Sequence, residues 1–149
     1  MIARTLYTGG TFDILHYGHL DFLARCKKLA ERVIVSLNED DFIYNFKGEY
    51  PILTYEERKR TLEHCKYVHQ VVKNIGGIDS KAAIEQVNPS IIAVGTDWAC
   101  KDYYAQMSFD QKWLDDKEIS LVYIPYGDSS VMSTTEIKRR IRNEDRCDR

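Results

Sequence analysis

The sequence predicts an α/β fold, in which one domain is built on a doubly wound, parallel, five-stranded sheet. Three observations support this prediction. Short apolar runs that fit buried strands alternate along the chain with segments of helical periodicity. The connections between them are short, and no internal repeat divides the chain. With 149 residues, 44% of them hydrophobic, the chain has the size and apolar content of one domain with one core.

The expected elements follow from local patterns. Residues 32–37 form a β-branched run, and residues 91–94 form a continuous apolar run of the kind that a parallel sheet buries. Thr54 and Ser133 are each followed three residues later by a glutamate, which is the capping-box pattern of a helix start. The expected strands are one ending at residues 6–7, then 32–37, 68–72, 91–94 and 119–124. The expected helices are 20–30, 54–67, 79–87, part of 103–117, and a last helix that begins at residue 133.

Two segments lack a clear period. Residues 42–53 contain Lys47-Gly48 and Pro51, and we predict a loop there that is long enough to suggest a function. Residues 143–149 form a charged tail that we expect to fray, so the domain is predicted to span residues 1–142.

Composition and charge argue against several classes of function. The net charge of −2 gives no general basic surface for nucleic acid, and no apolar run approaches the length needed to cross a membrane. The N-terminal residues show no secretory signal pattern, so we expect a cytoplasmic protein. The four cysteines are too widely spaced for the usual zinc or disulfide patterns, and we expect free thiols at Cys26, Cys65, Cys100 and Cys147.

Four stretches rich in glycine and polar residues follow directly after expected strands. They are residues 9–19, 38–53, 95–102 and 125–135. In a doubly wound parallel sheet, ligands bind beyond the carboxyl ends of the strands, where the strand order reverses. The sequence therefore predicts that these stretches form one binding site at one edge of the sheet.

The first of these stretches, residues 9–19, joins a strand to a helix and favours phosphate binding. Its glycines let backbone N–H groups approach an anion, and the helix N-terminus adds partial positive charge. His16 and His19 lie at the same helix start, where an imidazole can donate a hydrogen bond to phosphate or carry charge near neutral pH.

The sequence Gly10-Thr11-Phe12-Asp13 followed by His16-Tyr17-Gly18-His19 resembles the HxGH signature of the nucleotidylyltransferase superfamily. It is most similar to the cytidylyltransferase branch, above all to the bacterial glycerol-3-phosphate cytidylyltransferases. Residues 95–98 and 132–135 resemble the later G-x-D-W and I-S-T-T motifs of those enzymes, in the same order. The resemblance implies a Rossmann-like fold and a homodimer. It also implies that CTP and a phosphorylated alcohol, first of all glycerol 3-phosphate, react to give a CDP-alcohol and pyrophosphate.

In such a reaction the acceptor brings its own nucleophile, so the protein must supply cations and N–H donors. The resemblance implies roles for the following residues. The catalytic residues would be His16, His19 and Lys47. The nucleotide would contact Gly10, Thr11, Phe12, Arg58, Asp97, Ser133, Thr134 and Thr135. The acceptor pocket would include Asp13, Trp98 and Lys66. We expect Mg²⁺ to arrive on the substrate phosphates, with no metal ligand from the protein.

The chain departs from the resembled enzymes near its end. They have R-T-E-G before I-S-T-T, whereas residues 128–131 here are Asp-Ser-Ser-Val, so an acid takes the place of the triphosphate-binding arginine. We expect Asp128 to point away from the nucleotide and Arg139 to replace that arginine. In the same helix, Ile141 is expected to face the core and Lys138 to be solvated.

Two other functions stay open from the sequence. One is nucleotidylyl transfer to another phosphorylated acceptor, such as a sugar phosphate, with ATP as a possible donor. The other is a nucleotide-binding regulatory module without turnover, which the missing arginine keeps in consideration.

Overall fold

The computed structural model, which describes residues 3–96, 107–125 and 127–143, confirms the predicted α/β fold. Its strands are β1 (Thr5–Gly10), β2 (Arg32–Leu37), β3 (Gln70–Lys73), β4 (Ile91–Gly95) and β5 (Ser120–Ile124). Its helices are α1 (Tyr17–Leu29), α2 (Asp40–Lys47), α3 (Tyr55–Glu63), α4 (Lys81–Val87), α6 (Gln111–Asp116) and α7 (Thr134–Asn143).

The five strands form one parallel sheet in the order β3-β2-β1-β4-β5. The order reverses between β1 and β4, so loops that leave these two strands turn to opposite sides. Pairing continues just beyond two strands, because Asn38 N–H donates to Gly10 O and Asn74 N–H donates to Leu37 O. These contacts bring the ends of β1, β2 and β3 to one edge of the sheet.

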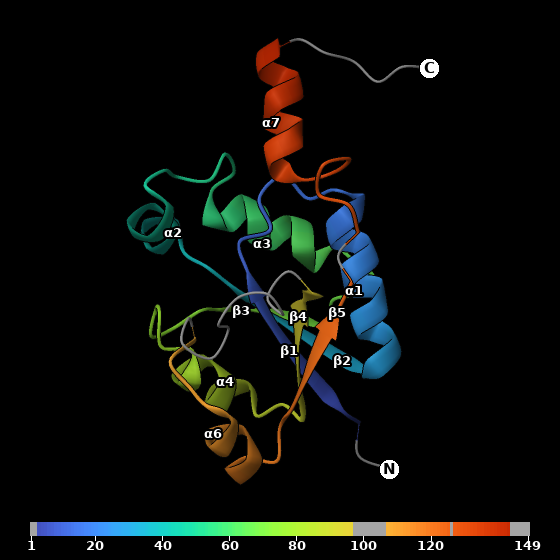
Figure 1. The fold of residues 1–149 in the computed structure, drawn as a ribbon, viewed down its shortest axis with the longest axis vertical. Helices are drawn as coiled ribbons and strands as arrows, with labels where there is room; N and C mark the ends of the chain where they lie inside the picture. The colour runs from blue at the N-terminus through green and yellow to red at the C-terminus, as the bar shows by residue number, and fades with distance from the viewer. Residues whose placement is uncertain (1–2, 97–106, 126, 144–149) are drawn as a thin grey trace.

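Two hydrophobic clusters cover the two faces of the sheet. One packs side chains of α1 and α3, such as Leu23 and Leu62, against Val33 and Val35 of β2. The other packs α4 and α6 against the opposite face, and Figure 1 shows these two helix pairs on different sides of the strands. Cys26 is buried in the first cluster, and Cys65 packs against it; both are free thiols, as predicted.

The segment 42–53 is not the long loop that we predicted, because α2 occupies its first half. The signals of this helix are local. Asp40 and Asp41 lie in its first turn, Lys47 lies in its last, and Gly48 ends it in the left-handed conformation with φ of 82°. The expected helix over 54–67 also ends earlier, at Glu63, and a turn leads to β3.

Helix α7 differs from the other long helices because none of its residues is buried. Figure 1 shows it projecting from the end of the molecule near the starts of α1 and α3. Ile141, which we expected to face the core, is 68% exposed. Residues 144–149, most of the predicted tail, lie outside the described residues. Within the described chain, no helix is both long and apolar enough to span a membrane.

Candidate active site

The carboxyl edge of the sheet holds a cavity of ≈ 650 Å³ at the point where the strand order reverses. Its walls come from the ends of β1 and β4, the start of α1, one side of α2 and the first turns of α7. Three of the four stretches that the sequence singled out, 9–19, 38–53 and 125–135, each contribute several residues to its lining. For the fourth, residues 95–102, only Gly95 and Thr96 lie within the described chain.

The turn after β1 is tightly folded. Phe12 and Ile14 both have φ of 50°, a left-handed conformation that non-glycine residues rarely adopt. The Phe12 ring is buried, and it lies so close to Gly10 that a Cβ there would be 2.9 Å from the ring. Gly10 therefore leaves room for the ring that fixes the turn, in addition to any backbone contact that it offers a ligand.

His16 and His19 form a hydrogen-bonded box at the start of α1. The N–H of Gly18 donates to Nδ1 of His16 at 3.1 Å, and the N–H of His16 donates to Nδ1 of His19 at 3.2 Å. The two rings stack with their centroids 3.9 Å apart. A Cβ on Gly18 would lie 2.9 Å from the His16 ring, which explains why glycine separates the histidines.

This box determines which protonation state the rings offer to a ligand. A backbone N–H can only donate, so Nδ1 of each ring accepts and the proton of each neutral ring lies on Nε2. Burial lowers the pKa of His16, and burial followed by repulsion from His16 lowers the pKa of His19 to about 3. Of the two possibilities left by the sequence, the structure favours neutral donors over charged imidazoles. His19 lines the cavity, and His16 stacks against it.

Two charged residues hold the loop after α2 and the turn after β1 in place. The buried Asp13 carboxylate accepts hydrogen bonds from the N–H groups of Ile52 and Leu53 at 2.7 and 2.9 Å. Arg58 is only 1% exposed and donates to Thr11 O at 2.8 Å, to Leu53 O at 3.0 Å and to the Asp40 carboxylate at 2.6 Å.

These contacts change how two predicted site residues are interpreted. Arg58 is absent from the described cavity lining, and its donors are directed to the protein, so the structure does not support direct nucleotide contact by this residue. Asp13 reaches the cavity wall, but its carboxylate is occupied by two N–H groups of the loop. Both residues position the site.

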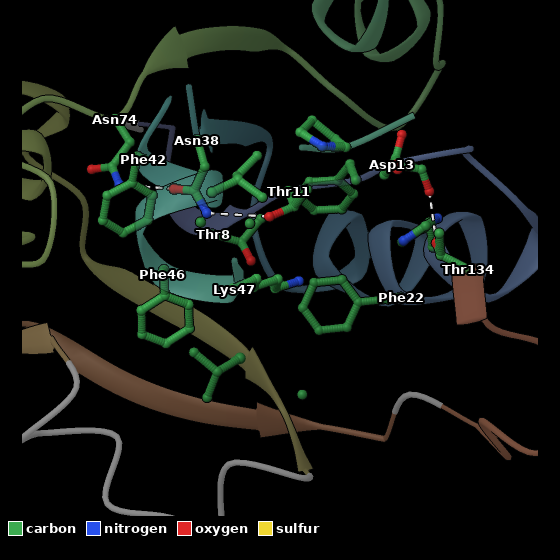
Figure 2. Close-up of a pocket in the computed structure, with 18 of the residues that line it drawn as sticks. Thr8, Thr11, Asp13, Phe22, Asn38, Phe42, Phe46, Lys47, Asn74 and Thr134 are labelled. Atoms are coloured by element: carbon green, nitrogen blue, oxygen red, sulfur yellow. Dashed lines mark hydrogen bonds between the residues drawn. The ribbon is translucent and has the colours of Figure 1, made fainter. Parts of the chain in front are cut away.

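The start of α7 is attached to the same turn. The Thr134 hydroxyl donates to Asp13 O at 2.7 Å, a bond that Figure 2 shows between the two elements. Ser133 acts as a helix cap, because its hydroxyl accepts the N–H of Glu136 at 3.0 Å. Thr134 and Thr135 line the cavity, whereas Ser133 lies outside its described lining. The first turn of α7 therefore lies at the cavity, where the backbone N–H groups of a helix N-terminus favour an anion.

A chain of amide side chains, which the sequence analysis missed, supports Thr11. The Asn74 side-chain amide donates to Gly77 O at 3.4 Å and to Asn38 Oδ1 at 2.8 Å, and Asn38 Nδ2 donates to Thr11 Oγ1 at 3.4 Å. Figure 2 shows this chain along the cavity wall. Because the Thr11 oxygen accepts from Asn38, its own proton is left to donate elsewhere. Both asparagines directly follow strands, and this position was the signal in the sequence that could have identified them.

The cavity wall formed by α2 combines a cation with aromatic rings. Lys47 lines the cavity, and Figure 2 shows its amine directed toward the ring of Phe22. Phe42 and Phe46 line the same wall with their rings nearly parallel, at a centroid distance of 6.2 Å and an angle of 8°. This side of the cavity can therefore hold both an anion and a flat apolar group.

The remaining residues that the sequence analysis discussed have different positions in the structure. Lys66 lies between α3 and β3, away from the carboxyl edge of the sheet. Its side chain is exposed, with its amine over the Tyr67 ring. Lys66 is therefore not part of the described cavity lining, where we expected the acceptor pocket. Arg139 pairs with Glu136 on α7, whereas Lys138, which we expected to be solvated, lines the cavity. Asp97 and Trp98 lie outside the described residues.

Comparison with known proteins gives one family for most of the chain. The family model described as cytidylyltransferase-like matches residues 7–140. The chain is 30% identical over 142 residues to the glycerol-3-phosphate cytidylyltransferase of Staphylococcus aureus, covering 95% of this chain and 98% of that protein. It is 35% identical over 137 residues to the FAD synthase of Thermococcus sibiricus, covering 90% of this chain and 89% of that protein.

A solved structure shows the same fold. The lipopolysaccharide core biosynthesis protein of Thermoplasma volcanium superposes with a TM-score of 0.69 at 27% identity, over 85% of this chain and 100% of that one.

Proposed function

The chain belongs to the cytidylyltransferase-like family, and on that premise we propose that it transfers a nucleotidyl group from a nucleoside triphosphate to a small phosphorylated acceptor. An oxygen of the acceptor phosphate attacks the α-phosphorus and forms a new P–O bond. The bond from the α-phosphorus to the bridging oxygen breaks, and its electron pair leaves with pyrophosphate. The protein need not supply a nucleophile or a base.

The observation that carries this proposal is the histidine box at the start of α1. This box supports the proposal, because its two neutral rings carry their protons on Nε2 and lie at a helix N-terminus, where backbone N–H groups also favour an anion. Neutral imidazoles suit this role, because they can stabilise charge that develops on the α-phosphate and the leaving group without a proton transfer. Lys47 and the first turn of α7 add positive charge and N–H donors on the other walls.

For the substrates, we propose CTP and glycerol 3-phosphate first, giving CDP-glycerol. The cytidylyltransferases of Staphylococcus aureus and Bacillus subtilis support this pair, since the chain is also 33% identical to the second over 138 residues. A sugar phosphate remains an alternative acceptor. The rings of Phe42 and Phe46 favour a second candidate, a flavin mononucleotide joined to AMP from ATP, because a flat ring system could pack against this wall.

The experiment is pyrophosphate release measured for the four NTPs against glycerol 3-phosphate, several sugar phosphates and flavin mononucleotide. Turnover with CTP and glycerol 3-phosphate supports the first candidate, and turnover with ATP and flavin mononucleotide supports the second. Phe42→Ala should then raise the KM for the flavin substrate and leave that for glycerol 3-phosphate nearly unchanged. Nucleotide binding without turnover on any acceptor would favour a regulatory module.

We also propose that Mg²⁺ enters with the triphosphate. Mg²⁺ commonly binds through substrate phosphates, and it would add positive charge to a cavity whose histidines are neutral. No three His, Cys, Asp or Glu side chains gather into a metal site among residues 3–96, 107–125 and 127–143. Turnover should stop in excess EDTA and return when Mg²⁺ is added, whereas full activity in EDTA would contradict this proposal.

A homodimer, implied by the resemblance, stays a proposal. The exposed side chain of Ile141 on α7 offers one position at which to test it. Light scattering after size exclusion should show twice the chain mass, and Ile141→Glu should lower it toward the monomer if α7 lies in the interface.

A further inference from the structure

Lys138 lies where α7 meets the cavity. It follows Thr134 by four residues, so both side chains lie on the same helix face, and both line the cavity. The Lys138 amine is 3.8 Å from the carboxylate of Glu49, which follows the end of α2 and also lines the cavity. The side chain of Lys138 is 26% exposed and that of Glu49 is 73% exposed.

The distribution of cationic side chains around the cavity makes Lys138 a candidate for binding the phosphates. Among the described residues that line it, the cationic side chains are Lys47 from α2 and Lys138 from α7. Arg58 directs its donors into the protein, and Arg139 pairs with Glu136. A triphosphate carries several negative charges, so it needs a cation on the α7 side as well as on the α2 side. The N-terminus of α7 adds partial positive charge on the same side of the cavity, since Thr134 and Thr135 line it too.

The ion pair between Lys138 and Glu49 is of a kind that a phosphate can displace. Its two charges are 3.8 Å apart and the carboxylate is exposed to water, so the pair adds little stability. Phosphate oxygens near a helix N-terminus are better partners for an ammonium group than an exposed carboxylate. Glu49 also places a negative charge at the wall of a cavity that must accept an anion.

We propose that Lys138 binds the triphosphate in place of the family arginine, and that Glu49 is the counter-ion that the triphosphate displaces. This inference rests on the proposed function, because it names the residue that holds the donor nucleotide. It predicts opposite effects for the two partners of one ion pair. Loss of Lys138 weakens nucleotide binding, and loss of the Glu49 charge strengthens it.

The experiment measures the binding, by calorimetry, of the α,β-methylene analogues of CTP and ATP with Mg²⁺. Lys138→Met should raise Kd about tenfold, the scale of one hydrogen bond to a charged group. Lys138→Arg should restore most of the binding. Glu49→Gln should lower Kd about twofold, the scale of an exposed ion pair, and this gain should become smaller when Lys138 is also Met, because only the repulsion between Glu49 and the phosphates then remains. The matched control is Arg139→Met, which removes the same charge one residue further along α7.

The outcomes separate this inference from the proposed function. If Lys138→Met and Arg139→Met have equal effects on Kd, or if Lys138→Met leaves the Kd of both analogues unchanged, the assignment of Lys138 is overturned while the proposed function stands. If the wild-type protein binds neither analogue and releases no pyrophosphate with any NTP, both are overturned. Equal binding by the wild type and Glu49→Gln overturns the role of Glu49.

Discussion

Two helices, α1 and α7, direct their N-termini at the same cavity, yet they are built differently. The start of α1 is partly buried: His19 is only 8% exposed, and its ring contacts those of His16 and Phe12, beside a cluster that includes Phe22 and Leu23. Helix α7 has no buried residue. The cavity contacts at its start are the hydroxyl bond to Asp13 O and the long ion pair to Glu49.

This difference indicates that the two helix N-termini have different functions in the site. Donors that stabilise a transition state must be fixed before the reaction, and a buried box provides that. Groups that bind and release the phosphates of a substrate can be held more loosely. Changes near α1 should therefore affect turnover and folding together, whereas changes near α7 should affect mainly the KM for the nucleotide.

The largest effect is expected for the histidines. His16→Ala or His19→Ala should lower kcat at least a hundredfold, about 3 kcal/mol, because each removes one preorganised donor. Steady-state pyrophosphate release measures this loss, and circular dichroism checks that the fold remains. His64→Ala, at an exposed helix end, is the control and should be nearly silent. Near wild-type turnover of either variant would contradict the assignment of transition-state stabilisation to the start of α1.

A second large effect is expected for Arg58, this time on stability. Arg58→Met keeps the apolar stem but leaves the carbonyls of Thr11 and Leu53, and the Asp40 carboxylate, without their buried donor. The free energy of unfolding should fall by about 2–4 kcal/mol, and turnover should fall with it because the turn is displaced. Urea unfolding measures the change. Arg60→Met, on the exposed side of α3, should change stability by less than about 0.5 kcal/mol.

The fold could be predicted because its signals are local. The β-branched run of β2 and the apolar run of β4 are long and bounded by turns, so their positions are almost as expected. Helix α2 was missed, although its acidic start and its glycine end were visible, because Pro51 and the lack of a clear period favoured a loop. Ile141 was misplaced because periodicity shows a helix face but not whether anything packs against it.

The site was predicted less completely, for a physical reason. A motif gives residues near each other in the chain; of those it indicated, His19, Lys47 and Thr135 line one cavity, and His16 stacks on His19. The bonds from Ile52 and Leu53 to Asp13, and from Arg58 to Thr11, join residues 39–47 positions apart. Such contacts decide whether a side chain faces a ligand or the protein. Asn38, Asn74 and Lys138 reach the cavity only through the fold, so the motif alone could not identify them.

A smaller effect is expected from acid. Burial keeps His19 neutral in the folded protein, where its pKa is about 3, whereas the unfolded chain takes up a proton below pH ~6.5. The unfolded state thus binds more protons as pH falls, and the free energy of unfolding should drop by about 2 kcal/mol between pH 7 and pH 5 from this group. Urea unfolding at both pH values should show a smaller drop in the free energy of unfolding for His19→Gln than for the wild-type protein.

The smallest effect is expected for Asp128, although it takes the place of an arginine in related enzymes. Its carboxylate accepts hydrogen bonds from the Ser130 hydroxyl and N–H at 2.6 and 2.9 Å, and these bonds lower its pKa. The charge is exposed and screened by salt, and the residue lies outside the described cavity lining, between Gly127 and Ser129, which both reach it.

Asp128→Ala should therefore change the KM for the nucleotide by less than about twofold, downward if at all, since an exposed charge contributes little. Thr134→Val is the contrast, because it breaks the bond that holds the start of α7 to Asp13 O and should raise the same KM. Steady-state kinetics at low and moderate salt measure both. If Asp128→Ala raises the KM tenfold while Thr134→Val does not, the loop before α7 binds the nucleotide through Asp128, and the loosely held helix end is not the phosphate site.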